Sequence, residues 1–229
     1  GEKNANVTLH MYTVSSNNTK QVALGDYEYI PRIKWSNDAN ILVATTLNRH
    51  QNNLKLHKVN ASKANATLLF NETDKAYIDV TNNLTFLNDN SFIWTSEKDG
   101  FNHIYHYNFK GKLINQVTKG NWEVTQYYGF NENKNTIYYQ SVENGSTNRG
   151  VYAIGIDGKK KKLLSNKDGQ NTAAFSKNLN YFINTFSSAE IPPIYALFSG
   201  EGEMLKVIKD NTQLKEDLSA YKMSPKEFS

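Results

Sequence analysis

The feature that most constrains the fold of this chain is a pattern that returns four times along its 229 residues. Each unit opens on an aromatic residue, followed by a polar turn, a β-rich run, a second turn and two more β-rich runs. The opening residues are Trp35, Phe86, Phe130 and Phe175, which lie 51, 44 and 45 positions apart. A period in the forties with several strands per repeat is typical of a β-propeller, in which each repeat is one four-stranded blade. Because one blade cannot bury both faces alone, the repeats predict stacked antiparallel sheets.

The blade boundaries follow from the alternating runs and the turns between them. We expect four blades at residues 31–70, 84–117, 124–165 and 172–208, preceded at 7–24 by the outer strands of a blade whose beginning is missing. Pairs such as Asp157-Gly158 tolerate the positive φ that tight hairpins require. Residues 1–210 are therefore predicted to form an all-β, partial propeller.

A short helix is expected only near the end of the chain. Asn211 or Thr212 can cap it, and Leu214, Leu218 and Tyr221 would lie along one side. The polar, proline-bearing stretch that follows is typical of a linker. Residues 211–229 are thus predicted to be a short helix and the start of a connection to another domain.

Charge and composition argue against several classes of function. The net charge is only +4, and the basic residues are scattered among acidic ones, which argues against a nucleic-acid partner. We interpret the exception, Lys159 to Lys162, as a solvated hairpin shoulder. The absence of cysteine excludes disulfides, Cys-type zinc sites and thiol catalysis. No run approaches the ~18 apolar residues of a membrane span, and no signal peptide is visible. The sequence predicts no cofactor and no metal.

Two adjacent stretches carry the most specific motif. The first runs from Trp94 to Tyr105 and the second from Val117 to Val124, and their defining residues are Trp94, Glu97, Asp99, Gly100, His103, Tyr105, Gly120, Trp122 and Glu123. Together they resemble the paired signature S-E-x-D-G-[aromatic]-x-H-[apolar]-Y and T-x-G-x-W-E-V. That signature belongs to the dipeptidyl peptidase IV subfamily of prolyl oligopeptidase-like serine peptidases. The resemblance runs from about Val7 to the end of the chain, and Ser176 to Tyr181 and Pro192 to Tyr195 also fit the last blade of the family.

The resemblance implies an architecture and an activity for the whole protein. In that family an eight-bladed propeller sits over an α/β-hydrolase domain with a Ser-Asp-His triad, and the two enclose a cavity. The enzyme releases dipeptides from peptide N-termini, with proline or alanine second. This chain is similar to the C-terminal half of such a propeller, so earlier blades and a hydrolase domain after Ser229 are its expected partners. The expected location is periplasmic or secreted.

Two features of the family's active centre are not found in this sequence. The paired glutamates that hold the substrate's α-ammonium group lie in earlier blades, and no adjacent Glu-Glu occurs here. A G-x-S-x-G nucleophile elbow is also absent, since Gly145-Ser146-Thr147 lacks the closing glycine. We therefore expect no catalytic residue in this chain and no catalysis by it alone.

One residue is a candidate for substrate contact. In mammalian members of the family, an aromatic-arginine pair of the substrate pocket comes from the loop before the strand that is equivalent to the strand of Phe86 in this sequence. The corresponding stretch here is Lys75 to Val80 and contains no arginine. Tyr77 could form an aromatic wall against peptide substrate, or it could be a plain tyrosine at a strand edge.

Other constellations have structural interpretations. His103 and His106 lie three apart on a predicted strand and therefore point to opposite faces, which argues against shared metal ligation. Glu97 and Asp99 flank a tight turn, where acids cap backbone N–H groups rather than face one cleft. We expect Trp35, Trp94 and the period-marking phenylalanines to lie in the core, and the indole of Trp122 to pack against a neighbouring sheet.

Two functional hypotheses follow. The first is a propeller fragment that walls and gates the substrate cavity of a dipeptidyl peptidase IV-like enzyme. The second is a freestanding, non-catalytic propeller that binds a protein partner. Exposed blade faces and unpaired strand edges also predict self-association of the chain.

Overall fold

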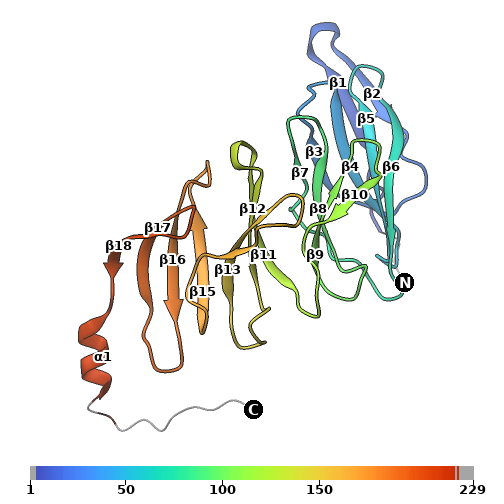
Figure 1. Cartoon of the computed structure of the whole chain (residues 1–229). Helices are drawn as coiled ribbons and strands as arrows, with labels where there is room; N and C mark the ends of the chain where they lie inside the picture. The colour runs from blue at the N-terminus through green and yellow to red at the C-terminus, as the bar shows by residue number, and fades with distance from the viewer. Residues whose placement is uncertain (1–3, 220, 222–229) are drawn as a thin grey trace. The chain divides into compact units, whose positions relative to one another are not determined.

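The structure is a computed structural model that describes residues 4–219 and 221 (Figure 1). It divides into two compact units, one made of residues 1–100 and 105–115 and the other of residues 101–104 and 116–229. Within the described residues, the strands form four four-stranded sheets and one two-stranded sheet. Neighbouring strands in every sheet are consecutive in sequence, which is the meander that a propeller blade requires. The predicted partial propeller of about four blades and a strand pair is therefore confirmed.

The first unit begins with a two-stranded hairpin and a complete four-stranded sheet. The hairpin pairs β1 (Leu9–Thr13) with β2 (Asn18–Val22) across a 3-10 turn, η1 (Val14–Ser16). The next sheet comprises β3 (Tyr29–Trp35), β4 (Ile41–Leu47), β5 (Asn53–Asn60) and β6 (Asn65–Thr73). Its pairs are all antiparallel.

The third sheet lies at the division between the two units. It comprises β7 (Thr85–Phe86), β8 (Phe92–Ser96), β9 (His103–Tyr107) and β10 (Leu113–Gln116). The division passes through β9 and β10, so residues 103, 104 and 116 belong to the second unit. The first half of the motif is thus divided between the two units, and the second half belongs to the second unit.

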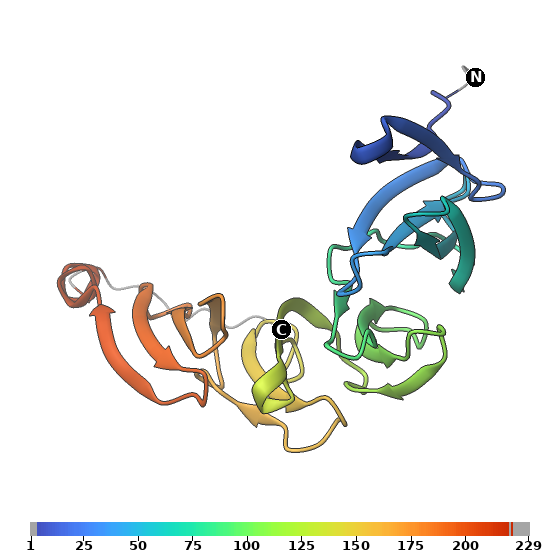
Figure 2. The same ribbon diagram turned by 90° about the horizontal axis from the view of Figure 1, so that it is seen from above.

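The second unit contains two further four-stranded sheets, whose strands lie side by side in Figures 1 and 2. The first comprises β11 (Val124–Asn131), β12 (Thr136–Ser141), β13 (Gly150–Gly155) and β14 (Lys162–Leu163), with the 3-10 turn η2 (Glu132–Lys134) between β11 and β12. The second comprises β15 (Gln170–Phe175), β16 (Tyr181–Ser187), β17 (Ile194–Ser199) and β18 (Met204–Lys209). Helix α1 (Thr212–Ser219) follows β18 (Figure 1).

Alternating side chains explain how a sheet can be buried on both faces. On β4, Leu42 and Ala44 join one apolar cluster that includes Val22 of β2. Val43, between them, joins a different cluster that includes Phe92 of β8. Successive side chains of a strand point to opposite faces, so the continuous apolar run of β4 is typical of a strand covered on both sides.

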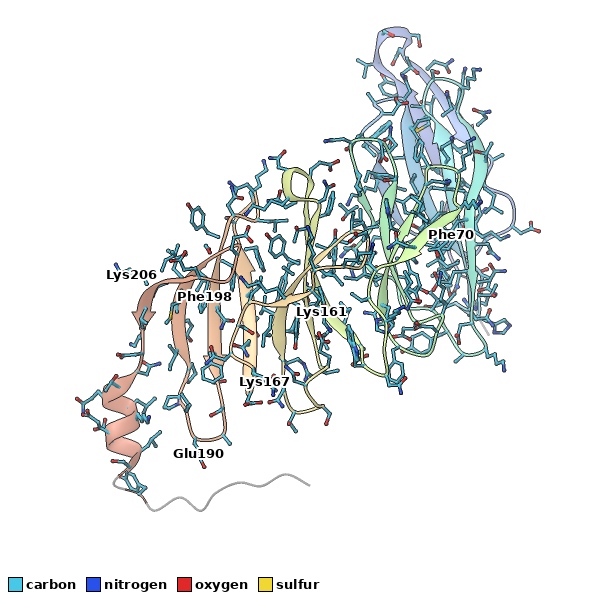
Figure 3. The ribbon with its side chains drawn as sticks, in the orientation of Figure 1. Phe70, Lys161, Lys167, Glu190, Phe198 and Lys206 are labelled. Carbon is cyan, nitrogen blue, oxygen red and sulfur yellow. The ribbon has the colours of Figure 1, made fainter. Side chains whose placement is uncertain are left out.

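Aromatic stacking forms the centre of the core in the second unit. Phe182 on β16 is 1% exposed and lies between two parallel-stacked rings. Its ring centroid is 4.8 Å from that of Phe175 on β15 and 5.1 Å from that of Phe198 on β17, which Figure 3 labels. Offset stacking at this spacing adds to the stabilisation that burial alone gives.

The prediction that Trp35 lies in the core is wrong. Its side chain is 51% exposed, and Ile33, two residues earlier on the same face of β3, is also exposed. Trp35 and Ile33 pair with Leu42 and Ala44 of β4 and share their face of the sheet. The apolar cluster on that face includes Leu42 and Ala44 but neither Trp35 nor Ile33, so the covering residues do not reach β3. Trp94 is buried as predicted, while Phe86 and Phe175 are half-buried and pack against the cores of their own units.

The helix near the end of the chain is present and begins at Thr212, and the backbone carbonyl of Asn211 accepts the N–H of Lys215. The carboxylate of Asp210 accepts a hydrogen bond from the backbone N–H of Thr212 at 3.1 Å. The amide of Asn211 instead donates to the backbone carbonyl of Pro193. No residue of α1 is buried, and Leu214 is 45% exposed. The predicted linker stretch from Met223 to Ser229 lies outside the described residues. No helix in the described part of the chain has the length and apolar character to cross a membrane.

Candidate functional site

A carboxylate on β6 connects the second and third sheets of the first unit. The indole Nε1 of Trp94 donates to Glu72 Oε2 at 2.8 Å, and the Ser96 hydroxyl donates to Glu72 Oε1 at 2.6 Å. Phe70, two residues before Glu72 and labelled in Figure 3, meets the indole ring edge-on with centroids 5.7 Å apart. Both oxygens of a half-buried carboxylate are thereby satisfied, as burial requires. We call Glu72, Trp94 and Ser96 the Glu72 bridge.

A lysine and two tyrosines lie next to the Glu72 bridge. Lys98 Nζ donates to the Tyr107 hydroxyl at 2.7 Å and lies 3.9 Å from the centre of the Tyr105 ring, a cation–π contact. Burial lowers the pKa of Lys98, against the attraction of Glu72 and Asp99. Burial raises the pKa of Tyr105, helped by Asp99, and raises the pKa of Tyr107 to about 12, helped by Glu72. Both tyrosines are therefore neutral phenols near neutral pH.

The two acids of the first motif flank a tight turn between β8 and β9. The backbone N–H of Gly100 donates to the carbonyl of Glu97 at 2.8 Å and closes the turn. Gly100 has a φ of +102°, a conformation that favours glycine. Glu97 and Asp99 are thus placed by the turn that the motif encodes, with Asp99 acting electrostatically on Tyr105.

His103 is the fully buried centre of the second motif cluster. Its Nδ1 lies 3.1 Å from Thr118 Oγ1, and its Nε2 lies 3.0 Å from the carbonyl oxygen of Gly120. Thr118 Oγ1 also accepts the backbone N–H of Ile104 at 2.9 Å. A carbonyl oxygen only accepts, so Nε2 carries the proton and the Thr118 hydroxyl donates to Nδ1. This assignment satisfies both ring nitrogens and ties β9 to the segment after β10.

Gly120 and Trp122 complete that cluster. The Trp122 ring meets His103 edge-on at 4.9 Å between centroids and stacks on Tyr139 of β12 at 6.3 Å. Gly120 has a φ of +144°, and a Cβ at this position would lie 2.2 Å from Trp122 Nε1. Only glycine therefore allows the indole to cover the buried imidazole. We call His103, Thr118, Gly120 and Trp122 the His103 cluster.

The basic run and Glu123 lie beside the His103 cluster. Lys161, labelled in Figure 3, forms an ion pair with Glu143, and its Nζ lies 5.6 Å from the centre of the Trp122 ring. Lys162 Nζ donates to the backbone carbonyl of Glu201. All four lysines of the run are exposed, as a solvated hairpin shoulder requires, and two of them also make specific contacts at the surface. The side chain of Glu123 is exposed, and its backbone carbonyl accepts the N–H of Val142.

The two histidines of β9 have separate partners. His106 Nε2 lies 2.9 Å from Ser91 Oγ, whereas both nitrogens of His103 are used within the His103 cluster. Within the part of the chain that the structure describes, no group of three or more His, Cys, Asp or Glu side chains is arranged to hold a metal ion.

Two histidines, the buried His57 and the half-buried His106, are expected to make the first unit sensitive to mild acid. Burial lowers the pKa of His106, and burial together with Lys55 lowers the pKa of His57, which bonds to Thr46. The unfolded chain binds these protons near the ordinary pKa of about 6.5, while the folded chain resists them, so stability falls as pH drops below that value. Each histidine adds at most about 1.4 kcal/mol per pH unit to the slope.

The measurement is the free energy of unfolding from urea titrations at several values between pH 5 and pH 8. The double variant H57Q/H106Q retains hydrogen-bonding side chains and is expected to flatten the slope. H10Q, at an exposed position on β1, is the matched control. An unchanged slope in the double variant would rule out this origin of acid sensitivity.

Tyr77 lies in the segment between β6 and β7 and is 61% exposed. Its neighbour Ile78 is buried and anchors the segment through a backbone N–H bond to the carbonyl of Gln51 at 2.8 Å. The tyrosine ring is therefore accessible on an anchored segment, a placement compatible with both interpretations of this residue.

Sequence reasoning missed the central residue of the Glu72 bridge. Glu72 stands 22 positions before Trp94 at the end of a strand, and no local motif marks it. It also missed Arg32 and Lys34 on β3, which line a pocket with Trp94. The sequence did contain one sign of these two residues, because Arg32 and Lys34 alternate with apolar residues along β3. That sign was not used, since Trp35 at the end of the strand was expected in the core.

Comparison with known proteins shows what this chain is similar to. Residues 1–193 match the family model described as the dipeptidyl peptidase IV (DPP IV) N-terminal region. The crystal structure of Porphyromonas gingivalis dipeptidyl peptidase 4 is 42% identical and superimposes with a TM-score of 0.91. That match covers 100% of this chain and 33% of the other.

Fungal proteins are more distant relatives over the same region. A protein of Aspergillus flavus named "Probable dipeptidyl peptidase 4" is 25% identical over 96% of this chain and 30% of its own length. Dipeptidyl peptidase 4 of Trichophyton rubrum is 26% identical over 99% of this chain and 31% of its own length. The chain therefore spans about a third of the length of the relatives it matches.

Proposed function

This chain belongs to the dipeptidyl peptidase IV family and matches the N-terminal region of that family. We propose that it walls and gates the substrate cavity of a serine exopeptidase. The whole protein would remove X-Pro or X-Ala dipeptides from peptide N-termini. A ring of blades admits short unfolded peptides and excludes folded proteins by size, so the propeller supplies selectivity without chemistry.

The observation that carries this proposal is the Porphyromonas gingivalis match, which extends over the entire chain at high structural similarity. The motif residues support it physically. The Glu72 bridge and the His103 cluster each hold a strand of the third sheet to a separate segment through charge-assisted or fully satisfied hydrogen bonds. Such contacts favour a stiff wall rather than a mobile loop surface.

The catalytic groups would come from outside this chain. The sequence has neither an adjacent Glu-Glu pair nor a G-x-S-x-G elbow. Ser146 lies in the loop between β12 and β13, where the backbone N–H of Gly145 donates to the carbonyl of Val142. We propose that the α-ammonium anchor lies in other blades, and that a hydrolase domain follows the segment after α1.

The test is hydrolysis of Gly-Pro-p-nitroanilide by the chain and by the full-length protein. We expect turnover by the full-length protein and none above buffer by the 229-residue chain. Full-length protein with alanine at the elbow serine is the control for contaminating peptidases. Turnover by the chain alone would refute the division of labour, and a reading frame that encodes no hydrolase domain would favour the freestanding binding propeller instead.

Tyr77 is proposed as an aromatic wall of the substrate pocket in the full-length enzyme. If so, Y77A is expected to raise KM in the same assay with little change in kcat, because the ring would bind ground state and transition state alike. Y12A, at a similarly exposed tyrosine on β1, is the matched control. Equal kinetics for Y77A and Y12A would leave Tyr77 as a strand-edge residue.

Self-association of the chain is proposed through the outer edge of its last sheet. β18 pairs only with β17, and all six of its residues are exposed. Four of these are apolar: Met204, Leu205, Val207 and Ile208. An apolar strand with unpaired backbone groups is a template for pairing with a second copy.

Light scattering is expected to give a concentration-dependent mass above that of the monomer. V207K should reduce it by placing a charge on the edge strand. V14K, which changes an exposed valine of the β1–β2 turn, should not. A clean monomer at high concentration would contradict the proposal.

The family resemblance also supports a periplasmic or secreted location, which cell fractionation of the native protein would test.

A further inference from the structure

We propose that a small pocket beside β3 in the first unit binds an oxyanion, either a carboxylate group or a phosphate. The pocket has a volume of about 180 Å³ and opens to the surface, where Arg32 and Lys34 are exposed. Arg32 and Lys34 of β3 line it, together with Thr81, Asn82 and Trp94. The proposal does not depend on the peptidase function, since it rests on residues of this unit alone.

The charge of the lining is positive and uncompensated. Arg32 and Lys34 are its two charged residues, and no Asp or Glu lines the pocket. Among the described residues, neither cation forms an ion pair. Glu72, which binds the indole nitrogen of Trp94, is not part of the lining.

Both cations are held by neutral acceptors that leave donors unused. Arg32 Nε donates to Asn82 Oδ1 at 2.6 Å, and its Nη1 donates to the backbone carbonyl of Pro31 at 2.7 Å. Lys34 Nζ donates to the backbone carbonyl of Leu84. A guanidinium has five N–H donors and an ammonium three, so each retains capacity for a ligand in a position already fixed.

A second pocket, in the other unit, differs because acidic side chains lie beside its lysines. That cleft, of about 440 Å³, is lined by Lys134, Lys160 and Lys162, but Glu201 and Asp157 line it as well. Lys134 Nζ is bound by the Glu201 carboxylate at 2.6 Å. The pocket beside β3 lacks such an acid, and partial burial lowers the pKa of Lys34. A bound anion would remove that electrostatic cost.

Size and geometry select the ligand class. Pockets for whole small molecules occupy roughly 300–1,000 Å³, so this smaller space suits a group of a few atoms. The planar fork of arginine matches the paired oxygens of carboxylate and phosphate. The hydroxyl of Thr81 and the amide of Asn82 can add neutral hydrogen bonds.

The test is titration of the 229-residue chain with sodium phosphate, with sodium acetate and with sodium chloride at matched ionic strength. The readout is the ¹H–¹⁵N resonance of the Trp94 indole, assigned with W94F. We expect saturable shifts with phosphate, acetate or both, and none with chloride. The double variant R32Q/K34M is expected to weaken binding at least about tenfold, since two charge-assisted hydrogen bonds are lost.

The control variant K63M removes one positive charge from the exposed β5–β6 turn and is expected to bind as the unchanged chain does. Binding of phosphate alone would identify a phosphate site, and binding of acetate alone a carboxylate site. No saturable shift with either anion would overturn the proposal, as would equal affinity in R32Q/K34M. Circular dichroism would verify folding of each variant, and R32K, which keeps the charge but loses the fork, provides a milder second variant.

Discussion

Among Gly→Ala substitutions at the described glycines, Gly111→Ala is expected to cause the largest loss of stability, and that loss falls on the first unit. Gly111 lies in the turn between β9 and β10, with a φ of +76°. A Cβ placed there would lie 1.6 Å from the backbone carbonyl oxygen of Leu69 on β6. Because the obstacle is backbone of a paired strand, the turn and β6 would have to separate.

The matched control for this prediction is Gly25→Ala. Gly25 has almost the same φ, +77°, lies in the same unit, and has no atom within 4 Å of an added Cβ. Both variants carry the cost of an alanine in the left-handed region, about 1–2 kcal/mol. The difference between them isolates the steric term, which we expect to exceed about 3 kcal/mol, at the upper end for overpacking. Urea unfolding monitored by tryptophan fluorescence measures both, and equal losses would contradict the close approach of turn and strand.

Phe182→Ala is expected to cost about 3–5 kcal/mol of unfolding free energy in the second unit, the range for truncation of a fully buried phenylalanine. The ring lies between Phe175 and Phe198, so its removal takes away two stacking contacts and leaves a cavity between three strands. Because β15, β16 and β17 are held by regular backbone pairing, little collapse into that space is possible.

Phe182→Leu and Phe101→Ala bracket the interpretation. Leucine restores much of the lost volume and should recover more than half of the loss, since volume-conserving changes are tolerated best. Phe101, in the same unit, is 38% exposed, so its truncation should cost much less. The measurement is the free energy of unfolding in urea. A cost for F182A no greater than that for F101A would show that the stack is not the centre of this core.

Much of the fold could be predicted from the sequence because its information is local. Strands are marked by the alternation of apolar and polar side chains, and turns by residues such as Gly111 and Gly158. Both signals depend only on residues that are a few positions apart in the sequence. The order of the strands then follows, because each strand pairs with its neighbours in sequence.

What sequence reasoning missed depends on contacts between distant positions. Glu72 binds Trp94 across 22 positions, and Arg32 binds Asn82 across 50. Trp35, which opens the first repeat, was expected in the core, but burial requires residues that cover its face of the sheet, and the pattern of one strand does not reveal them. The sequence identified His103 as a motif residue, but its tautomer could be assigned only from the positions of Thr118 and Gly120.

The Glu72 bridge has a consequence for how such a protein can change over evolutionary time. The second and third sheets are separate backbone ladders, and the bridge joins them through a carboxylate on one and an indole and a hydroxyl on the other. A gene duplication or recombination event that inserted a foreign repeat between them would leave the half-buried Glu72 carboxylate without its donors, at a cost of about 1–3 kcal/mol. The second and third sheets are therefore expected to be exchanged as one pair that carries the acid and its two donors together.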